Sequence, residues 1–406
     1  METKIQPQRG ETVADRQRPE QQQLGIPWGG FYVFPEFEYS EYLNDNIFAV
    51  ESNTQSDRIS VFAPGVTLTS NWTRHRLDVS FSGELGRYRD LFTEDYDDIQ
   101  FSSGAKVDLV KQSFISLGVS FADLHESRDS LDDAGGLNPT KYRLSNAFVN
   151  LTYKPGRFSL APTLSLNEYD FDDVKAVQFG QNVVIDQDDR DRSGYVLDLE
   201  VAYEIGVQEV FLRLSQFETE YDRLQNFSLF DRSSKGNETG MGVVLDLGGI
   251  TSSRLYYGYR NQRFDQPLPD IDTPVYELRF TWNVSTLTTL ELGAGRSTLE
   301  TNSLVYSGYL SSLWSFRLDH EIRRNLILNF EYSRIDDRYE GIGSASRDDQ
   351  TDSSGIGLKW IFNRFSEVMF RYEHTNRQSN DNSIPRGFED GDFSNDAVWA
   401  RIGLRI

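Results

Sequence analysis

Residues 315–333 read SFRLDHEIRRNLILNFEYS, and their side chains change character at every second position. The apolar face holds Phe316, Leu318, Ile322, Leu326, Leu328, Phe330 and Tyr332, with His320 as a misfit, and the opposite face holds Arg317, Asp319, Glu321, Asn329, Glu331 and Ser333. A period of two residues on either side of the polar tripeptide 323–325 predicts a β-hairpin. The fold class then depends on whether the charged face meets bulk water or an enclosed, water-filled space.

The alternation continues from Trp28 to the last residue, in segments joined by short turns and long loops in strict succession. Eight short turns are expected, at 71–74, 110–113, 154–157, 205–208, 249–253, 284–288, 323–325 and 362–365. Nine longer connections, several of them acidic, are expected near 45–56, 89–95, 126–140, 173–191, 222–236, 263–272, 299–306, 338–351 and 378–392. This predicts eighteen strands, the first at about residue 30 and the last at 394–406. Sorting short turns to one end and long loops to the other is typical of bacterial outer-membrane barrels.

Composition narrows the class of protein further. The 406 residues include no cysteine, which excludes disulfides and thiolate chemistry. A net charge of -22 argues against a nucleic-acid partner, because phosphate binding needs clustered Lys and Arg. No stretch approaches the roughly 18 apolar residues of a membrane-spanning helix, whereas a closed barrel also satisfies its backbone in lipid. We therefore predict an all-β protein: one antiparallel transmembrane barrel with short periplasmic turns and long acidic extracellular loops.

Two regions are expected along the chain. Residues 1–24 are polar and without apolar periodicity, which predicts a flexible tail, and residues 25–406 form the barrel. The start METKIQPQRG lacks the apolar core of a signal peptide, so the sequence is interpreted as a mature form.

The charged face of the strands is predicted to line the lumen. A barrel of about this strand number is wide enough for a water-filled channel, so the charges of the opening stretch would point inward. Aromatic residues such as Trp72, Trp282 and Tyr372 recur where strands should leave the bilayer. The expected lumen-lining residues are Arg76, Asp78, Glu84, Lys106, Asp108, Asp198, Glu200, Arg213, Glu277, Arg279, Glu291, Arg317, Asp319, Glu331, Lys359, Arg371, Glu373 and Arg401.

Residues 33–90 carry a more specific pattern. A first strand ends in Asn44-Asp45-Asn46, with Phe48 following, and Ser56-Asp57 leads into a second strand containing Ala63-Pro64-Gly65. The third strand runs into Gly86-Arg87-Tyr88. This region resembles the β-barrel porin 2 family, also described as outer-membrane β-barrel proteins of exopolysaccharide operons. The resemblance implies an outer-membrane pore, often encoded beside machinery for polysaccharide assembly and export.

The favoured hypothesis for function is export of a secreted polysaccharide through the barrel. It implies contact with outer-membrane lipid and lipopolysaccharide, and with periplasmic and inner-membrane export proteins. The alternative is a general or solute-specific diffusion porin. A third class is an outer-membrane hydrolase or a purely structural barrel.

Catalytic chemistry is weakly supported by the sequence. His125 and His374 lie where strands pass into long loops, with carboxylates nearby, but rim histidines are usually just solvated. The acidic loops lack the spacing of a calcium-binding loop. No enzyme activity, cofactor or metal is therefore expected.

Overall fold

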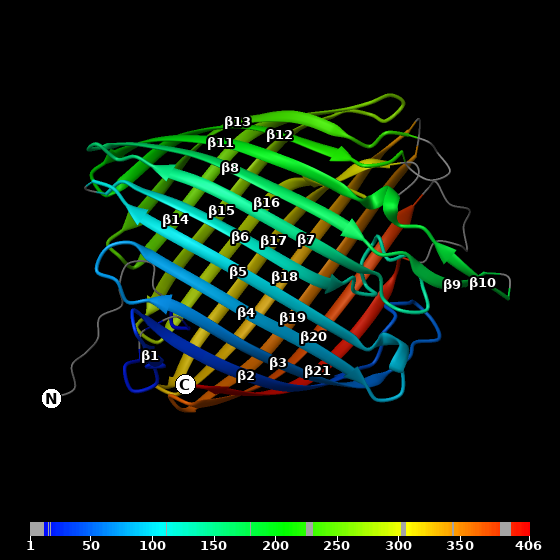
Figure 1. Cartoon of the computed structure of the whole chain (residues 1–406), viewed down its shortest axis with the longest axis horizontal. Coiled ribbons are helices and arrows are strands. Elements are labelled where there is room, and N and C mark those ends of the chain that lie inside the picture. The colour runs from blue at the N-terminus through cyan, green and yellow to red at the C-terminus, as the bar shows by residue number, and fades with distance from the viewer. Residues whose placement is uncertain are drawn as a thin grey trace.

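Antiparallel strands wind around the molecule at a steep tilt and close into a barrel (Figure 1). The computed structural model describes residues 12–14, 16, 18–110, 112–178, 180–224, 230–301, 306–342, 345–381 and 391–406. Each barrel strand pairs with the next one along the chain, and the last strand pairs with the first through Glu36–Asn44 and 397–405. The barrel is therefore closed and leaves no free sheet edge.

Eighteen strands form the barrel within the described residues, as the sequence predicted. They are β2 (Phe31–Asn44), β3 (Asp57–Ser70), β4 (Arg76–Tyr88), β5 (Tyr96–Asp108), β6 (Phe114–His125), β7 (Lys141–Thr152), β8 (Phe158–Phe171), β11 (Arg192–Ile205), β12 (Gln208–Tyr221), β13 (Ser234–Leu247), β14 (Thr251–Phe264), β15 (Ile271–Ser285), β16 (Thr288–Leu299), β17 (Tyr306–Arg323), β18 (Leu326–Gly341), β19 (Ser346–Asn363), β20 (Ser366–Asp381) and β21 (Phe393–Arg405). The predicted fold class is confirmed.

The short turns gather at one end of the barrel and the long loops at the other (Figure 1). The C-terminus lies at the short-turn end. Between β11 and β12 the turn has two residues, and Gly206 adopts φ +69°, a left-handed conformation that glycine enters without a Cβ clash. The short-turn end is periplasmic and the long-loop end extracellular.

Three small strands and two short helical turns accompany the barrel. The strand β1 (Ile26–Trp28) pairs with the start of β2. The strands β9 (Val174–Gln178) and β10 (Gln181–Ile185) form a hairpin that projects beyond the barrel wall at the long-loop end (Figure 1). The 3-10 turns are η1 (Phe92–Glu94) and η2 (Asp188–Arg190). The sequence interpretation of 173–191 as a plain loop was wrong, because strands of five residues are too short to show a clear period.

The predicted loop at 338–351 was also wrong in extent, because β18 runs to Gly341 and β19 begins at Ser346. In this part of the two strands the outward side chains are polar, as at Arg334, Asp336 and Asp348. The backbone ladder persists there, with Arg338 and Asp348 paired across it at 3.2 Å. Apolar and polar residues alternate only where a strand crosses lipid, so the pattern in the sequence stops before the strands themselves end. The loop predicted at 378–392 likewise begins too early, because β20 runs to Asp381, and residues 382–390 lie outside the described part of the chain.

The apolar face of each strand points outward. Leu199 lies opposite Leu214 in the sheet register, and Leu255 lies opposite Leu278, in the same phase as many exposed apolar side chains. His320, the misfit of this phase, lies close to the turn at 324–325 and hydrogen-bonds Thr288 at 2.9 Å. Among the residues that the structure describes, no helix is long and apolar enough to cross a membrane.

Aromatic rings lie flat against part of the inner wall. Phe211 and Tyr256 are buried and stack with their ring centroids 6.1 Å apart. They lie over Gly242 and Gly240 of β13, where a Cβ atom would collide with the rings. Glycine is required at these two positions because the rings occupy the space of the missing side chains.

Candidate functional site: the lumen and its two ends

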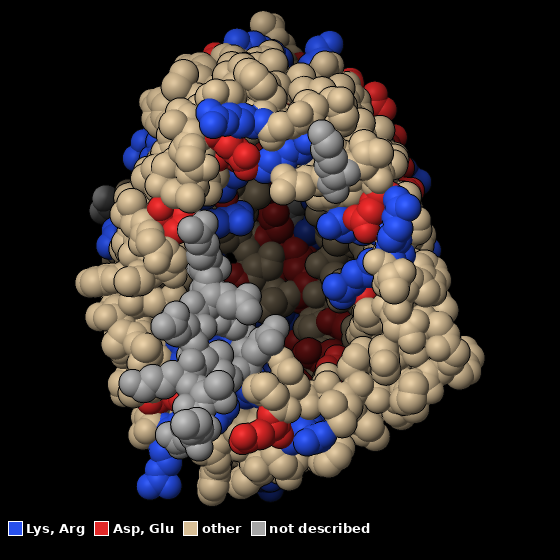
Figure 2. All heavy atoms as spheres, turned by 90° about the vertical axis from the view of Figure 1, so that its left-hand side faces the viewer, with Lys and Arg blue, Asp and Glu red and all other residues tan. Residues whose placement is uncertain are grey.

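Charged side chains meet across several strands on the concave face of the barrel. The Arg254 Nη2 atom lies 2.6 Å from Glu200 Oε2, although two strands separate β14 from β11. On the convex outer face of a curved sheet the side chains diverge, so an ion pair between strands that are two strands apart forms only on the concave inner face. Figure 2, viewed from the short-turn end, shows a hollow with Asp and Glu side chains in its depth.

Each of the eighteen residues predicted to line the lumen has a polar partner. The densest group surrounds Arg317, which lies 3.0 Å from carboxylate oxygens of both Asp319 and Glu331. Arg371 bridges Glu331 and Glu373 at 2.5 and 2.6 Å. The other contacts are Arg76–Asp78, Glu84–Tyr96, Lys106–Asp108, Asp198–Ser215, Glu200–Arg213, Arg213–Glu277, Arg279–Glu277, Glu291–Arg317, Lys359–Glu367 and Arg401–Glu38. That they line a conducting path stays a prediction.

Sequence reasoning missed part of this inner wall. Arg254 and Arg260 on β14 and Glu238 on β13 lie in the same phase, and Arg260 Nε contacts Glu238 Oε2 at 2.9 Å. In the stretch RLYYGYR the residues between the two arginines in this phase are Tyr256 and Gly258, which blur the alternation of polar and apolar residues. The sequence signal that could have found these residues is the two-residue period of β13 and β14, in the inward phase that Arg213 marks on β12.

The loop 126–140, here called the mouth loop, crosses the extracellular end of the barrel. It connects β6 and β7, yet its Asp132 Oδ1 accepts a hydrogen bond of 3.0 Å from Thr301, which follows β16. The Asp129 carbonyl oxygen accepts a 2.7 Å bond from Arg377 on β20. These partners lie far around the barrel wall from β6 and β7. The mouth loop therefore narrows the extracellular opening, a point that the sequence left open.

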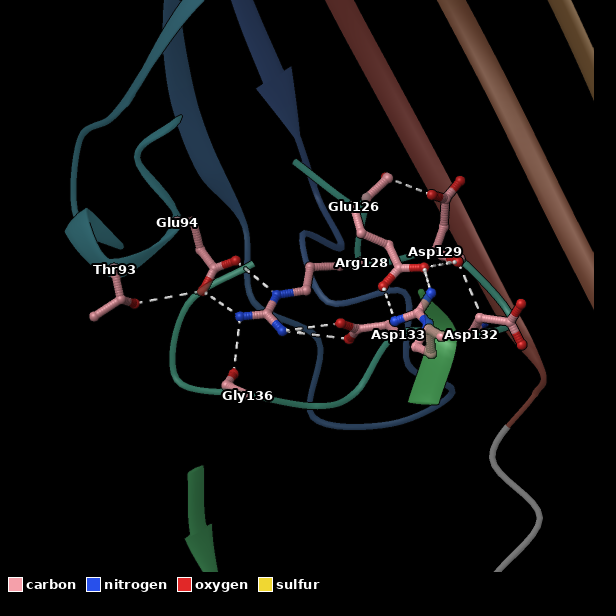
Figure 3. A network of polar contacts seen from close by, with 11 residues as sticks. Thr93, Glu94, Glu126, Arg128, Asp129, Asp132, Asp133 and Gly136 are labelled. Carbon is pink, nitrogen blue, oxygen red and sulfur yellow. Dashed lines mark hydrogen bonds and ion pairs between the residues drawn. The ribbon is translucent and has the colours of Figure 1, made fainter. Parts of the chain in front are cut away.

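One buried arginine holds the mouth loop in place (Figure 3). The Arg128 guanidinium donates to both oxygens of Glu94, at 2.7 and 3.0 Å, to the Gly136 carbonyl at 2.9 Å, and to Asp133 at 3.3 Å. The side chain of Arg128 is only 7% exposed. Burial opposes its charge, but the Glu94 hydrogen bond and the Asp133 charge outweigh burial and raise the pKa of Arg128. Burial also raises the pKa of Asp133, and the charge and hydrogen bond of Arg128 offset this rise only in part.

A second arginine ties the mouth loop to its neighbour. Arg190, in η2, donates to both carboxylate oxygens of Glu126, at 2.8 and 3.0 Å, and to Gln187 at 2.9 Å. Burial disfavours its charge, yet the hydrogen bond and charge of Glu126 prevail, and the pKa of Arg190 is raised. The backbone N–H of Leu137 also donates to the Lys175 carbonyl of β9. The mouth loop and the connection between β8 and β11 are thus joined to each other.

The periplasmic end holds a docked segment, here called the N-terminal strap (residues 12–14, 16 and 18–21). Val13 is buried, and its backbone N–H donates to Thr289 Oγ1 at 2.9 Å. Arg18 is also buried; it donates to Glu321 Oε2 at 2.9 Å and to the Arg324 carbonyl at 3.0 Å. The flexibility and domain boundary predicted for 1–24 stay predictions, and residues 1–11 lie outside the described part of the chain.

Replacing Arg18 by alanine should free the N-terminal strap. Removing one partner of a buried ion pair costs about 3–5 kcal/mol, because Glu321 would remain buried and unpaired. A spin label on a single cysteine at Glu20 should become more mobile in the variant. Arg74→Ala, on an exposed turn at the same end, should leave the label unchanged. Equal mobility in both variants would show that Arg18 does not hold the strap.

Other polar clusters have local explanations. His125 lies 3.0 Å from Asp98 and stacks on Tyr96, while His374 lies 2.8 Å from Asp396. The two histidines belong to β6 and β20, which do not pair, so the structure does not bring them together.

An acidic trio, Asp173, Asp186 and Asp188, has carboxylate oxygens within 4.8 Å of one another. Asp188 is already paired with Arg223 at 2.6 Å. Asp173 and Asp186 accept backbone hydrogen bonds within the same loop. These contacts account for the trio without a bound ion.

A closed antiparallel barrel with an apolar outer face, an ion-paired inner face and loops sorted by length is a transmembrane β-barrel of the bacterial outer membrane. The family described as "Putative beta-barrel porin 2" matches residues 18–402, and the chain belongs to this family. The resemblance seen at residues 33–90 is confirmed. The protein is thus an outer-membrane β-barrel porin.

Solved barrels of low sequence identity are similar in outline. OpdK from Pseudomonas aeruginosa shares 14% identity, with 92% of this chain and 99% of that chain covered and a TM-score of 0.46. OccAB3 from Acinetobacter baumannii shares 13% identity, with 93% and 100% covered and a TM-score of 0.48. No curated protein sequence matches the chain.

Proposed function

We propose that this porin is a diffusion channel for small solutes. The observation that carries the proposal is the anchored mouth loop, whose Asp129 and Asp132 reach strands far around the barrel wall. A small solute can pass beside such a loop, whereas a polymer chain needs an uninterrupted path of larger cross-section. The N-terminal strap adds a second docked segment at the periplasmic end.

The pairing of lumenal charges also favours diffusion of small solutes over capture of a polyelectrolyte. Arg213 and Arg254 both pair with Glu200, at 3.3 and 2.6 Å, and Arg213 also lies 3.8 Å from Glu277. Paired charges present local dipoles to water rather than a strong field of one sign. A long acidic polymer would find few unpaired cations along this wall. Polysaccharide export remains the second candidate, supported by the operon setting that the family resemblance implies, and it would require periplasmic and inner-membrane partners.

Purified porin in liposomes should separate these two functions. In osmotic swelling assays, glycerol, glucose, sucrose and raffinose should enter at rates that fall steeply with size, and dextran should be excluded. A deletion strain should keep its extracellular polysaccharide and take up small solutes more slowly. Liposomes that admit none of these solutes, with loss of extracellular polysaccharide in the deletion strain, would overturn the proposal in favour of export.

A further inference from the structure

One part of the inner wall carries no charge. In β6, β7 and β8, all of whose residues the structure describes, every Asp, Glu, Lys and Arg falls in the outward phase of Val149 and Leu166. These outward residues are Asp123, Lys141, Arg143, Glu168 and Asp170. The inward positions hold Ser, Thr, Asn, Gly, Ala, aromatic rings and two leucines, Leu124 and Leu144. This inner surface of β6–β8 is called the uncharged panel.

The centre of the uncharged panel is Phe148. It lies opposite Gly118 of β6 and Ser165 of β8, so it shares their inward phase. The ring lies over Gly118, where a Cβ atom would come within 2.5 Å of Phe148 Cε1. The missing side chain therefore lets the ring rest against the wall. Phe148 is nonetheless 45% exposed, in contrast to the buried rings Phe211 and Tyr256 of the charged wall.

Neutral hydrogen-bonding groups flank this ring. Asn146 and Asn150 lie two positions before and after Phe148, and their side chains share its face. Asn150 Nδ2 donates to Thr163 Oγ1 at 2.7 Å, and Asn146 Nδ2 lies 3.4 Å from Ser120 Oγ. Asn150 Nδ2 also donates to the Pro162 carbonyl at 3.3 Å, and Asn150 Oδ1 accepts from Thr152 at 3.0 Å, which leaves this oxygen a second lone pair. The panel thus combines an exposed aromatic surface with amides and hydroxyls on both sides.

This combination selects a chemical class of solute. Lys106 and Arg192 of the neighbouring strands lie over Phe114 and Tyr169 at the two ends of the panel. An ion that left water for its middle, around Phe148, would find no opposite charge on β6–β8, so its desolvation would go uncompensated there. A sugar ring has an apolar face of C–H groups, which suits the negative face of an aromatic ring, and a rim of hydroxyls that exchange hydrogen bonds with amides. Such binding is weak, which transport requires, because the solute must also leave.

We propose that the uncharged panel is a binding track for small uncharged sugars, with Phe148 as its stacking platform and Asn146 and Asn150 as hydroxyl partners. The inference rests on the proposed function as a diffusion channel and names its substrate class. Phe148 is then a specificity-determining residue rather than part of the packing that holds the barrel together.

The test measures how maltotriose modulates ion current through single channels of the full-length porin in planar bilayers. Maltotriose should reduce the wild-type current in a saturable way, and gluconate should show no saturable effect. In Phe148→Ala the half-saturating maltotriose concentration should rise about two- to tenfold, the range expected for loss of one aromatic contact. Phe148→Trp should retain saturation.

The matched control is Val149→Ala, the adjacent lipid-facing residue, which is also 45% exposed. It should leave half-saturation unchanged, with folding of each variant checked by heat-modifiable migration on gels. An unchanged half-saturation in Phe148→Ala, with sugars still entering liposomes, would overturn the binding track and leave the diffusion channel intact. Failure of every sugar to enter liposomes would instead overturn the proposed function.

Discussion

Replacing Arg128 by alanine is expected to release the mouth loop and raise the single-channel conductance. Arg128 is the shared partner of Glu94 and Asp133, and its loss would leave a fully buried carboxylate at Glu94 without a counter-charge. Removing one partner of a buried ion pair costs about 3–5 kcal/mol. The eighteen-strand ladder does not depend on this contact, so the barrel should still fold. Conductance and current noise in planar bilayers measure the effect.

Two further variants separate loop release from general damage. Arg143→Ala removes an arginine whose side chain is 61% exposed and that pairs with Asp170 at the surface, so conductance should not change. Adding Glu94→Gln to Arg128→Ala removes the stranded charge and should restore part of the wild-type conductance. A folded Arg128→Ala barrel with wild-type conductance and noise would disprove the anchoring role.

Replacing Leu214 by arginine is expected to impair barrel assembly. Leu214 lies midway along β12, opposite Leu199, on the outer face. A cation on the lipid face at mid-bilayer costs about 2–4 kcal/mol, since lipid offers neither water nor a counter-charge. The folded fraction in a urea series, read from heat-modifiable migration, should fall at lower urea than for the wild type.

The matched control is Ser215→Arg, one position along the same strand. Ser215 hydrogen-bonds Asp198 on the inner face, so an arginine there would meet a carboxylate and water. The variant should unfold at nearly the wild-type urea concentration. Equal losses from the two substitutions would contradict the assignment of inner and outer faces.

On the proposed diffusion function, the two ends of the barrel and its uncharged panel would sort solutes in different ways. The mouth loop, held by contacts such as Arg377 with Asp129, would limit solute size at the extracellular opening. The charged strands supply a polar, ion-paired surface, as at Glu200 with its two arginines. In the panel around Phe148, the inward positions of β6–β8 carry no Asp, Glu, Lys or Arg. On this proposal, size selection and chemical selection would belong to different elements.

The sequence determined the fold because strand periodicity is a local property. The stretch 315–333 predicted a hairpin, and β17 and β18 turn at 324–325 with Phe316 opposite Tyr332 and Arg317 opposite Glu331. Successive side chains of a strand must point to opposite faces, so alternation alone separates lipid from lumen. The order of short turns and long loops then fixed the strand number and the orientation.

Only the tertiary structure decided what fills the two openings. Arg18 meets Glu321 across 303 positions, and Arg377 meets Asp129 across 248. Neither pair has a sequence signature, because loop residues follow no period and their partners are set by closure of the barrel. The exposed ring of Phe148 likewise depends on Gly118 in the neighbouring strand. Local geometry determines which face a side chain occupies, but only the closed barrel determines which distant side chain it meets there.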